Sequence, residues 1–550
     1  MRYLHIIIYT MIILFFVSPS IFSTSIINVP LNHWSYSFIE RMQAKGILGE
    51  YISQTKPYSR GKMANMVLRI SSLLERGKIG LTKTDKELLQ CMKKEFAHEL
   101  ALSGIPDIAG NKHLIDWTDD EMSLVTEVSF TQNNHLDKYN PEGDRIYQSS
   151  INVDLYGDLW ENLSFYNHSQ ASHYAGAQDP PAWKRSDPWY NFRYPWRALS
   201  DSYFVFGNSK INISAGKDAI LWGPGYHGVI GLTSADRTFD IVKFHTNVWK
   251  LNFTSLLGFL RDDVIENNKS LVLRKNISAH RIEFTPYSGV CIAWQEAYVY
   301  DAKDLHIELL NPLMPYQMAE DYLGEIGNNT MEGDLVISLI PNTKIYSALF
   351  LDDFHPDKSP FKYPKFEWAI LNGALITDPF GIDDTDFVVE YARVEPWTYT
   401  HKGTIQNPPI PTAFKNFDEP LGHWIGPNSD DLFIQAGWRI TTNLRSAISY
   451  NRIRHGESGS NIYDAHRIGT DEEEKGFLKG IIENEKSIGV GLEYNNFHSM
   501  KVSANYKYKK TENKQKAEAQ FPRGIKERQS WKSGWNTVVN EFDVKLSFKY

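Results

Sequence analysis

Cysteine and long apolar runs are scarce in this chain. Its 550 residues include two cysteines, Cys91 and Cys291, and neither has neighbours at metal-ligand spacing. They fall in a predicted helix and a predicted strand of different regions, so we expect buried, unpaired thiols; a disulfide, which oxidising compartments permit, is the alternative. Beyond the N-terminus no stretch reaches the ~20 apolar residues of a transmembrane helix.

A positive charge excess and the common catalytic signatures are also missing. The net charge of −8 gives no basis for nucleic-acid binding. Neither a nucleophile elbow nor a His-Glu-x-x-His helix occurs. The carboxylate pairs Asp352-Asp353 and Asp383-Asp384 are adjacent residues, whose side chains point to opposite faces of a strand. The sequence therefore predicts no catalytic residue, metal site or cofactor.

The first residues predict export. Arg2 precedes an apolar run from Ile6 through Val17, and small residues follow as far as Ser25. This is the pattern of a secretory signal peptide, here residues 1–25, with an uncleaved N-terminal anchor as the alternative. An exported chain of this length is periplasmic, secreted or a β-barrel.

The last residues favour the barrel. Phe542, Val544, Leu546, Phe548 and Tyr550 alternate with Asp543, Lys545, Ser547 and Lys549. Successive side chains of a strand point to opposite faces, so one face is apolar and the other charged. An edge strand of a soluble sandwich could have this pattern, but a terminal aromatic is typical of the closing strand of an outer-membrane barrel.

The same alternation recurs from about Asp119 onward. Examples are residues 124–130, 151–159, 211–215, 335–339, 488–494 and 500–508. At ~20–25 residues per strand and connection, residues 119–550 predict an all-β fold: an antiparallel transmembrane barrel of roughly 16–20 strands. Charges on its strands, such as Arg281, Glu283, Glu390 and Arg393, are expected to point into the lumen, where they pair or line a sugar pathway.

Residues 26–118 have helical periodicity instead. Trp34, Phe38 and Met42 predict one helix, residues 63–74 a second, and the capping box Thr84-Asp-Lys-Glu87 opens a third. The run from Pro30 to Ile47, with Lys56–Arg60 and Met63-Ala64, resembles the S-layer homology motif, whose known examples bind cell-wall polymers. One partial copy favours a small periplasmic cap or plug on the barrel over a wall-binding module.

A long insert after Ala175 interleaves aromatic and basic residues. They are Trp183, Lys184, Arg185, Trp189, Tyr190, Arg193, Tyr194, Trp196 and Arg197. Aromatic faces pack on sugar rings and guanidinium groups pair with carboxylates, which suits an acidic polysaccharide. Packing of the insert into the lumen is the alternative. Two further inserts, 402–430 and 456–480, are predicted to be loops, and the acidic run Asp471–Glu474 a solvated one.

Four groups of motifs follow one another along the predicted barrel. They are Leu221-Trp-Gly-Pro-Gly-Tyr-His-Gly-Val-Ile-Gly-Leu-Thr-Ser234, His280-Arg-Ile-Glu-Phe-Thr-Pro286, Asn311-Pro-Leu-Met314 with Gly333-Asp-Leu335 and Leu351-Asp-Asp-Phe354 downstream, and Glu390-Tyr-Ala-Arg-Val-Glu-Pro-Trp-Thr-Tyr-Thr-His401. Together they resemble the Wzi-type capsule-assembly proteins of the outer membrane. The resemblance implies a barrel occluded by loops and helices that serves as a lectin-like attachment point for surface polysaccharide. The S-layer-like segment and the acidic loop depart from it.

The first of these motifs is also informative by itself. Its glycines and Pro224 fix an unusual backbone path, so Trp222, Tyr226 and His227 are held at a defined place. We take these residues as further candidates for polysaccharide contact, with a purely structural role as the alternative.

The sequence thus predicts a non-catalytic outer-membrane barrel that binds and anchors capsular or related surface polysaccharide. Its other expected partners are outer-membrane lipid, the barrel-assembly machinery at the C-terminal strand and, as an open alternative, peptidoglycan or wall polymer at residues 26–118. A porin or polysaccharide export channel is the rival hypothesis. A hydrolase with residues from separate strands is a third.

Overall fold

The fold is seen in a computed structural model of the chain. It describes residues 25–105, 108–119, 122–137, 144–160, 162–176, 196–234, 237–266, 269–303, 306–311, 313–324, 326–401, 412–417, 419–462, 465–467, 469, 471–514 and 533–550. The predicted signal peptide, apart from Ser25, lies outside these residues. Among the helices described, none is long and apolar enough to cross a membrane.

Eighteen antiparallel strands of the described chain close into a barrel. They are β3 (Ser123–Asp137), β4 (Asp144–Leu159), β5 (Leu163–Gly176), β6 (Trp196–Gly207), β7 (Ile211–Asp218), β9 (Phe239–Val248), β10 (Leu251–Glu266), β11 (Lys269–Tyr287), β12 (Val290–Asp301), β13 (Gly327–Ile340), β14 (Thr343–Asp353), β15 (Glu367–Thr377), β16 (Thr385–Val394), β19 (Ser429–Arg439), β20 (Leu444–Gly456), β21 (Ile482–Asn495), β22 (Met500–Glu512) and β23 (Thr537–Lys549). Each pairs with the next, and β23 closes on β3 with Phe548 opposite Phe130. The predicted fold class is confirmed.

The two faces of the strands divide as their alternation predicts. On β23, Phe542, Val544 and Phe548 are exposed on the outer face. Asp543 and Lys549, at alternate positions, point inward, where Asp543 Oδ1 lies 2.7 Å from His135 Nδ1 and Lys549 Nζ lies 2.5 Å from Glu127 Oε1. An apolar outer belt around a polar interior is what a bilayer requires of a barrel.

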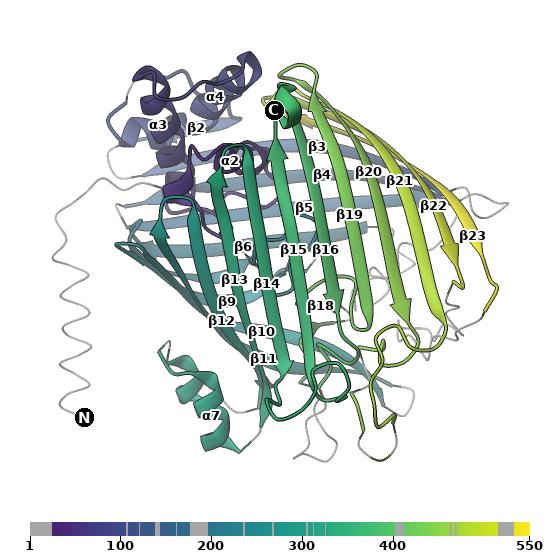
Figure 1. Cartoon of the computed structure of the whole chain (residues 1–550). Coiled ribbons are helices and arrows are strands. Elements are labelled where there is room, and N and C mark those ends of the chain that lie inside the picture. The colour runs from purple at the N-terminus through teal and green to yellow at the C-terminus, as the bar shows by residue number, and fades with distance from the viewer. Residues whose placement is uncertain are drawn as a thin grey trace, which may run out of the picture.

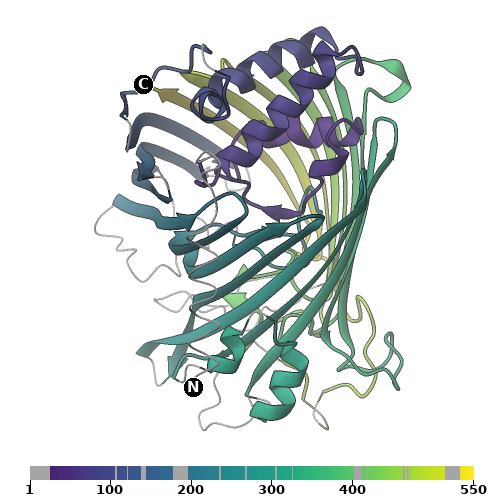
Figure 2. The same cartoon turned by 90° about the vertical axis from the view of Figure 1, so that its left-hand side faces the viewer.

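The two ends of the barrel differ in their connections. Short turns such as Leu159–Leu163 and Ile340–Thr343 join strands at one end, whereas long segments such as 394–429 and 456–482 join them at the other. The helices near the N-terminus lie at the end with the short turns (Figure 1, Figure 2). A second helical segment, η2 (Ile307–Leu310) and α7 (Tyr316–Leu323), lies at the opposite end (Figure 1).

The N-terminal helices form a compact unit with its own core. They are α2 (Ser35–Ala44), η1 (Gly49–Tyr51), α3 (Arg60–Glu75), α4 (Lys83–Glu95) and α5 (Ala97–Leu102), with the short strand β1 (Thr55–Lys56). The short strand β2 (Ile115–Thr118) follows them and pairs with β3 of the barrel. We refer to residues 25–105 as the cap. The predicted apolar stripes supply its core, which includes Phe38, Met42, Met63, Val67, Leu88 and Met92.

The predicted third helix begins and ends differently from the sequence expectation. The residue at its N-cap position is Thr82, two residues before the expected Thr84. Thr82 Oγ1 accepts a hydrogen bond from Asp85 N at 3.0 Å. Thr84 is buried within the first turn. The helix ends at Glu95 because the backbone of Phe96 leaves the helical region, and α5 begins at Ala97.

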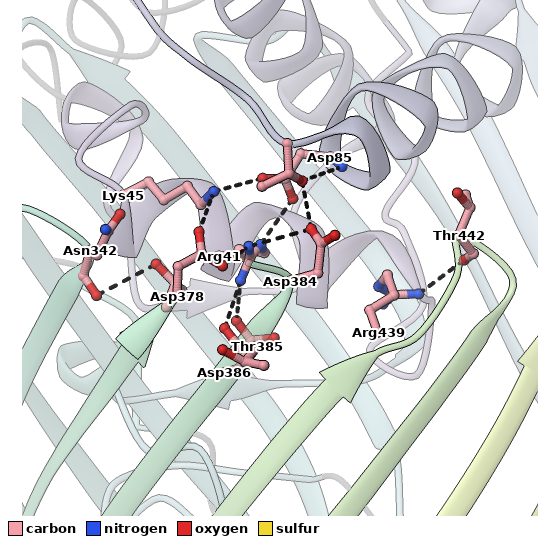
Figure 3. A network of polar contacts seen from close by, with 12 residues as sticks. Arg41, Lys45, Asp85, Asn342, Asp378, Asp384, Thr385, Asp386, Arg439 and Thr442 are labelled. Carbon is pink, nitrogen blue, oxygen red and sulfur yellow. Dashed lines mark hydrogen bonds and ion pairs between the residues drawn. The ribbon is translucent and has the colours of Figure 1, made fainter. Parts of the chain in front are cut away.

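A cluster of ion pairs fixes the cap to the barrel turns (Figure 3). Arg41 of α2 binds Asp85 of α4 at 2.9 Å, Asp378 at 2.5 Å and Asp386 at 2.6 Å. Lys45 bridges Asp85 and Asp378 at 2.7 and 2.8 Å. Asp378 lies in the turn between β15 and β16, so α2 is anchored to that turn. Because the pairs are largely buried, loss of one partner would leave a buried charge unpaired, a cost of roughly 3–5 kcal/mol.

The described residues of two inserted segments fill the side of the lumen that β9–β16 enclose. Residues 219–234 contain β8 (Leu221–Trp222), and residues 395–428 contain β17 (Lys415–Asn416) and β18 (Glu419–Pro420). Their apolar residues pack against inward-facing strand residues in one core, which includes Trp222, Ile230, Leu232, Phe414, Leu421, Ile277, Val336 and Phe350. The cap joins this core, because β1 pairs with β8.

Of the four charged strand residues that the sequence singled out, three point into the lumen as predicted and Arg393 does not. Arg281 is completely buried in the lumen, where Nη2 lies 2.6 Å from Asp334 Oδ2, and Glu283 accepts from Ser53 of the cap at 2.7 Å. Arg393, however, lies between Ala392 and Val394, both of which belong to the lumen core. Its side chain therefore points outward at the end of β16, where its guanidinium lies 3.8 Å from the centre of the Phe477 ring. The expectation for Arg393 was wrong because a loop aromatic shields it there.

The two cysteines are free thiols. Cys291 is buried in the lumen core on β12, whereas Cys91 is only half-buried on α4.

Candidate functional site

The aromatic and basic insert falls almost entirely outside the residues that the structure describes. Trp183, Lys184, Arg185, Trp189, Tyr190, Arg193 and Tyr194 lie outside the described residues, and the side chains of Trp196 and Arg197 at the start of β6 do too. Their proposed contact with polysaccharide stays a prediction. The remaining candidates, Trp222, Tyr226 and His227, are described and lie on one turn inside the barrel.

That turn is held by a single carboxylate. Glu390, which points inward from β16, accepts hydrogen bonds from the backbone N–H groups of Tyr226, His227 and Gly228 at 2.6, 2.9 and 3.1 Å. Tyr346 Oη donates to the same carboxylate at 2.7 Å. Successive backbone N–H groups that converge on one anion make a rigid nest. The backbone can take this path because Gly223 has a φ of +124°.

The three candidate side chains of the turn differ in burial and in the residues that they contact. Trp222 is buried in the lumen core, where it is closed off from any ligand. Tyr226 is 43% exposed, and its Oη donates to Gln435 Oε1 at 2.8 Å. His227 stacks on Phe433 with ring centres 4.0 Å apart and an interplanar angle of 7°, and its Nδ1 lies 2.8 Å from Asp431 Oδ2. Tyr226 and His227 are thus presented by fixed contacts to β19.

The second inserted segment meets the turn from the other side. Trp424 Nε1 donates to His227 O at 3.1 Å, and the two rings are perpendicular with centres 5.2 Å apart. Beside it, His423 is fully buried against Gly228, where a Cβ would lie 2.4 Å from His423 Nε2. Burial lowers the pKa of His423 to about 4, so its ring is neutral at physiological pH. Trp424 itself is 44% exposed.

A cavity of about 260 Å³ lies between the two segments. Tyr226, His227 and Trp424 form its aromatic part. Its polar part comes from Arg237, Asn416 and Glu419. Aromatic faces beside hydrogen-bonding groups in a small, preformed cavity are the features that hold a sugar ring.

Sequence reasoning missed several residues of this site. Trp424, Asp431, Phe433 and Gln435 were not singled out, because they lie about 200 residues from the turn in sequence. Trp424 lies in the insert 402–430, which was predicted only to be a loop, and the residues of β19 match no motif. Glu390 was identified through its motif, but its role in holding the turn was not predicted.

Comparison with known proteins gives a family match over part of the chain. Residues 327–522 match the family model of the capsule assembly protein Wzi. No curated protein sequence matches the chain. The comparisons give no support to the resemblance of the N-terminal segment to the S-layer homology motif. The apolar residues of that segment, such as Phe38 and Met42, are buried in the cap core.

Among the solved structures that match, Wzi has the same fold. Wzi of Escherichia coli is an outer-membrane protein involved in group 1 capsule assembly and a carbohydrate-binding β-barrel; it matches with a TM-score of 0.56 and 13% identity over 94% of this chain and 98% of that chain. Acinetobacter baumannii OccAB2 matches with a TM-score of 0.45 and 9% identity over 77% and 98%. Pseudomonas aeruginosa OpdK, solved with vanillate, matches with 0.44 and 8% over 78% and 98%. This chain therefore has the barrel fold of Wzi, and residues 327–522 carry the sequence pattern of the Wzi capsule-assembly family.

Proposed function

We propose that this chain is an outer-membrane barrel that binds and anchors capsular or related surface polysaccharide. The observation that carries the proposal is the cavity beside Tyr226, His227 and Trp424, whose aromatic walls are held rigidly by Glu390 and by β19. The family match over residues 327–522 and the carbohydrate-binding relative with the same fold support it.

The proposal places the cap in the periplasm and the long loops outside the cell, since barrels of this class have short periplasmic turns and longer extracellular loops. The exposed apolar side chains of the strands would face outer-membrane lipid, and β23 would be recognised by the barrel-assembly machinery. The contact of the cap with peptidoglycan remains an open alternative.

The site is proposed to bind without catalysis. His227 and Asp431 form an imidazole–carboxylate pair, but the imidazole is stacked flat on Phe433. The backbone carbonyl of His227 accepts a hydrogen bond from Trp424 Nε1. These contacts position the ring as part of the wall of the cavity. Purified protein should therefore leave the length of its polysaccharide unchanged, and measurable cleavage would favour the hydrolase hypothesis.

Binding measurements on the purified barrel test the site directly. We expect Tyr226→Ala and Trp424→Ala each to weaken binding to the polysaccharide of the source cell about fivefold, because loss of a sugar–aromatic stacking surface costs about 1 kcal/mol. Trp438→Ala, on the exposed outer face of β19, is the matched control and should bind normally. Unchanged affinity in both site variants would place the ligand elsewhere, with the insert at 183–197 as the next candidate.

The cellular role is tested by the fate of the polymer when the gene is deleted. Polymer that is made but shed into the medium would support an anchor. Polymer that is retained inside or never made would place the protein on the export path instead. An unchanged surface polymer would argue against both roles.

A further inference from the structure

The segment that contains η2 and α7 packs on the outer face of the barrel. Ala297 and Val299 of β12 belong to the lumen core, so Glu296, Tyr298 and Tyr300 point outward. Tyr298 and Tyr300 are nevertheless fully buried, because Leu309, Tyr316 and Ala319 cover them. A helical segment therefore lies against the side of the barrel that elsewhere exposes apolar residues such as Ile292 and Trp294.

This segment shields a polar pair that would otherwise face lipid. His280 of β11 points outward like Glu296, and His280 Nε2 lies 3.4 Å from Glu296 Oε2. Tyr316 N donates to the same Glu296 oxygen at 2.7 Å, and its ring packs on His280 with centres 4.5 Å apart. A polar pair of this kind is costly on the lipid face. By covering the pair, α7 allows the barrel to carry it there.

The remaining surface of α7 divides into two flanks. At about 100° per residue, Tyr316, Ala319 and Leu323 share the face toward the barrel. Met318 and Tyr322 form one flank and are 66% and 79% exposed, and Leu313, just before the helix, is 80% exposed. The other flank carries Gln317, Glu320 and Asp321. Gln317 Oε1 accepts a hydrogen bond from Asn329 Nδ2 at 3.3 Å. Asn329 lies two residues after the start of β13.

From this arrangement we infer that α7 is an interfacial helix that inserts Leu313, Met318 and Tyr322 among the acyl chains of the outer leaflet. The inference rests on the proposed placement of the barrel in the outer membrane. The helix lies on the same face of β12 that exposes Ile292 and Trp294, and its acidic flank suits the aqueous side. A short amphipathic helix with an aromatic residue at its rim is typical of a membrane interface. The contact would fix the depth and tilt of the barrel near its polysaccharide-binding end.

Spin-label accessibility in vesicles of phosphatidylethanolamine and phosphatidylglycerol tests the inference. A nitroxide is attached to Met318→Cys, Tyr322→Cys or Asp321→Cys in a Cys91→Ser background; Cys291 is buried and unreactive. We expect labels at 318 and 322 to collide severalfold more with oxygen, which dissolves in lipid, than with a water-soluble nickel chelate. The label at 321, on the acidic flank of the same helix, should show the opposite preference.

A label at Leu349→Cys, on the outer face of β14, separates two kinds of failure. If 349 meets lipid but 318 and 322 meet the nickel chelate as often as 321 does, the interfacial helix is refuted and the flank faces water or a partner molecule. If 349 also meets the chelate, the placement of the barrel in the membrane fails. Heat-modifiable migration on gels shows beforehand that each variant has folded.

Discussion

Glu390 is the residue on which the geometry of the turn depends. Its carboxylate accepts from three backbone N–H groups and from Tyr346 Oη. Without it these donors would be buried and unsatisfied, at a cost of about 1–3 kcal/mol each. We therefore expect Glu390→Ala to release the turn and to weaken polysaccharide binding at least about tenfold.

The control for Glu390 is Glu493→Ala. Glu493 is also a carboxylate on a barrel strand, but it is partly exposed, and its ion pair with Lys501, at 3.1 Å, lies away from the turn. Binding isotherms of the two variants give the comparison, and limited proteolysis reports whether residues 219–234 have loosened. Equal binding by both variants would show that the ligand does not use the turn.

At the scale of single residues, the sequence shows which residues shape a site more readily than which distant residues they contact. The glycines and Pro224 predicted a fixed turn, and the structure shows Tyr226 and His227 held there by backbone and ring contacts. The partners Phe433 and Trp424 could not be predicted, because barrel closure and a long inserted loop bring them to the turn. The orientation of Arg393 was wrongly predicted for a related reason. Alternation shows which face of a strand a residue occupies, but it does not show that a loop residue such as Phe477 covers part of the outer face.

Among the elements, α2 depends on a buried ion pair that acid can break. Burial by itself would raise the pKa of Glu40, but Lys344 of β14 and Lys56 outweigh it and lower the pKa from 4.5 to about 2. A folded-state pKa below the ordinary value stabilises the attached state above about pH 4.5. That stabilisation, roughly 3 kcal/mol at most, is lost as the pH falls toward 2.

We expect α2 to detach from β14 between about pH 4.5 and pH 2. Over this interval the protection factors of the amides in residues 35–44, which correct for the intrinsic slowing of exchange in acid, should fall while the strands stay protected. Glu40→Gln should exchange faster at neutral pH and should lack the Glu40 part of the pH dependence. Glu50→Gln, which alters an exposed pair with Arg69, should follow the native protein. Protection that is independent of both pH and Glu40 would contradict this role.

The closing strand β23 gives a second prediction for an element. Phe548 lies opposite Phe130, and Tyr550 N donates to Val128 O at 2.9 Å, so the last residues complete the seam with β3. We expect deletion of residues 548–550 to prevent assembly in the outer membrane, seen as loss of the heat-modifiable band. Phe542→Ser keeps the seam and should still assemble. A normal band after the deletion would show that the barrel closes without these contacts.

Strands were more predictable than helices for a physical reason. In a barrel each strand has one face toward lipid and one toward the interior, so the alternation in residues 488–494 or 542–548 is direct evidence of its environment. Helix ends depend on which side chain reaches the free N–H groups. Thr82 and Thr84 both qualify by type, and only the structure shows that Thr82 is the cap.

The whole molecule is distinguished from an open channel by how widely the cap is attached. It contacts turns all around its end of the barrel: His98 lies 3.9 Å from Asp158, Trp34 packs on Phe497, Thr442 donates to Glu87, and Arg41 and Lys45 bind Asp378. The inserted segments fill the lumen between β9 and β16. A polymer anchor has no need of a passage, and this arrangement opposes one.

We therefore expect the native protein to show no large, steady conductance in planar lipid bilayers. The double variant Arg41→Ala, Lys45→Ala should open intermittently, because it leaves Asp85 and Asp378 without their cations and frees α2 from the turn between β15 and β16. Arg69→Ala removes only an exposed pair of the cap and should remain closed. Steady channels from the native protein would mean that the cap does not seal the barrel, and the export-channel hypothesis would then account better for the polar lumen than an anchor does.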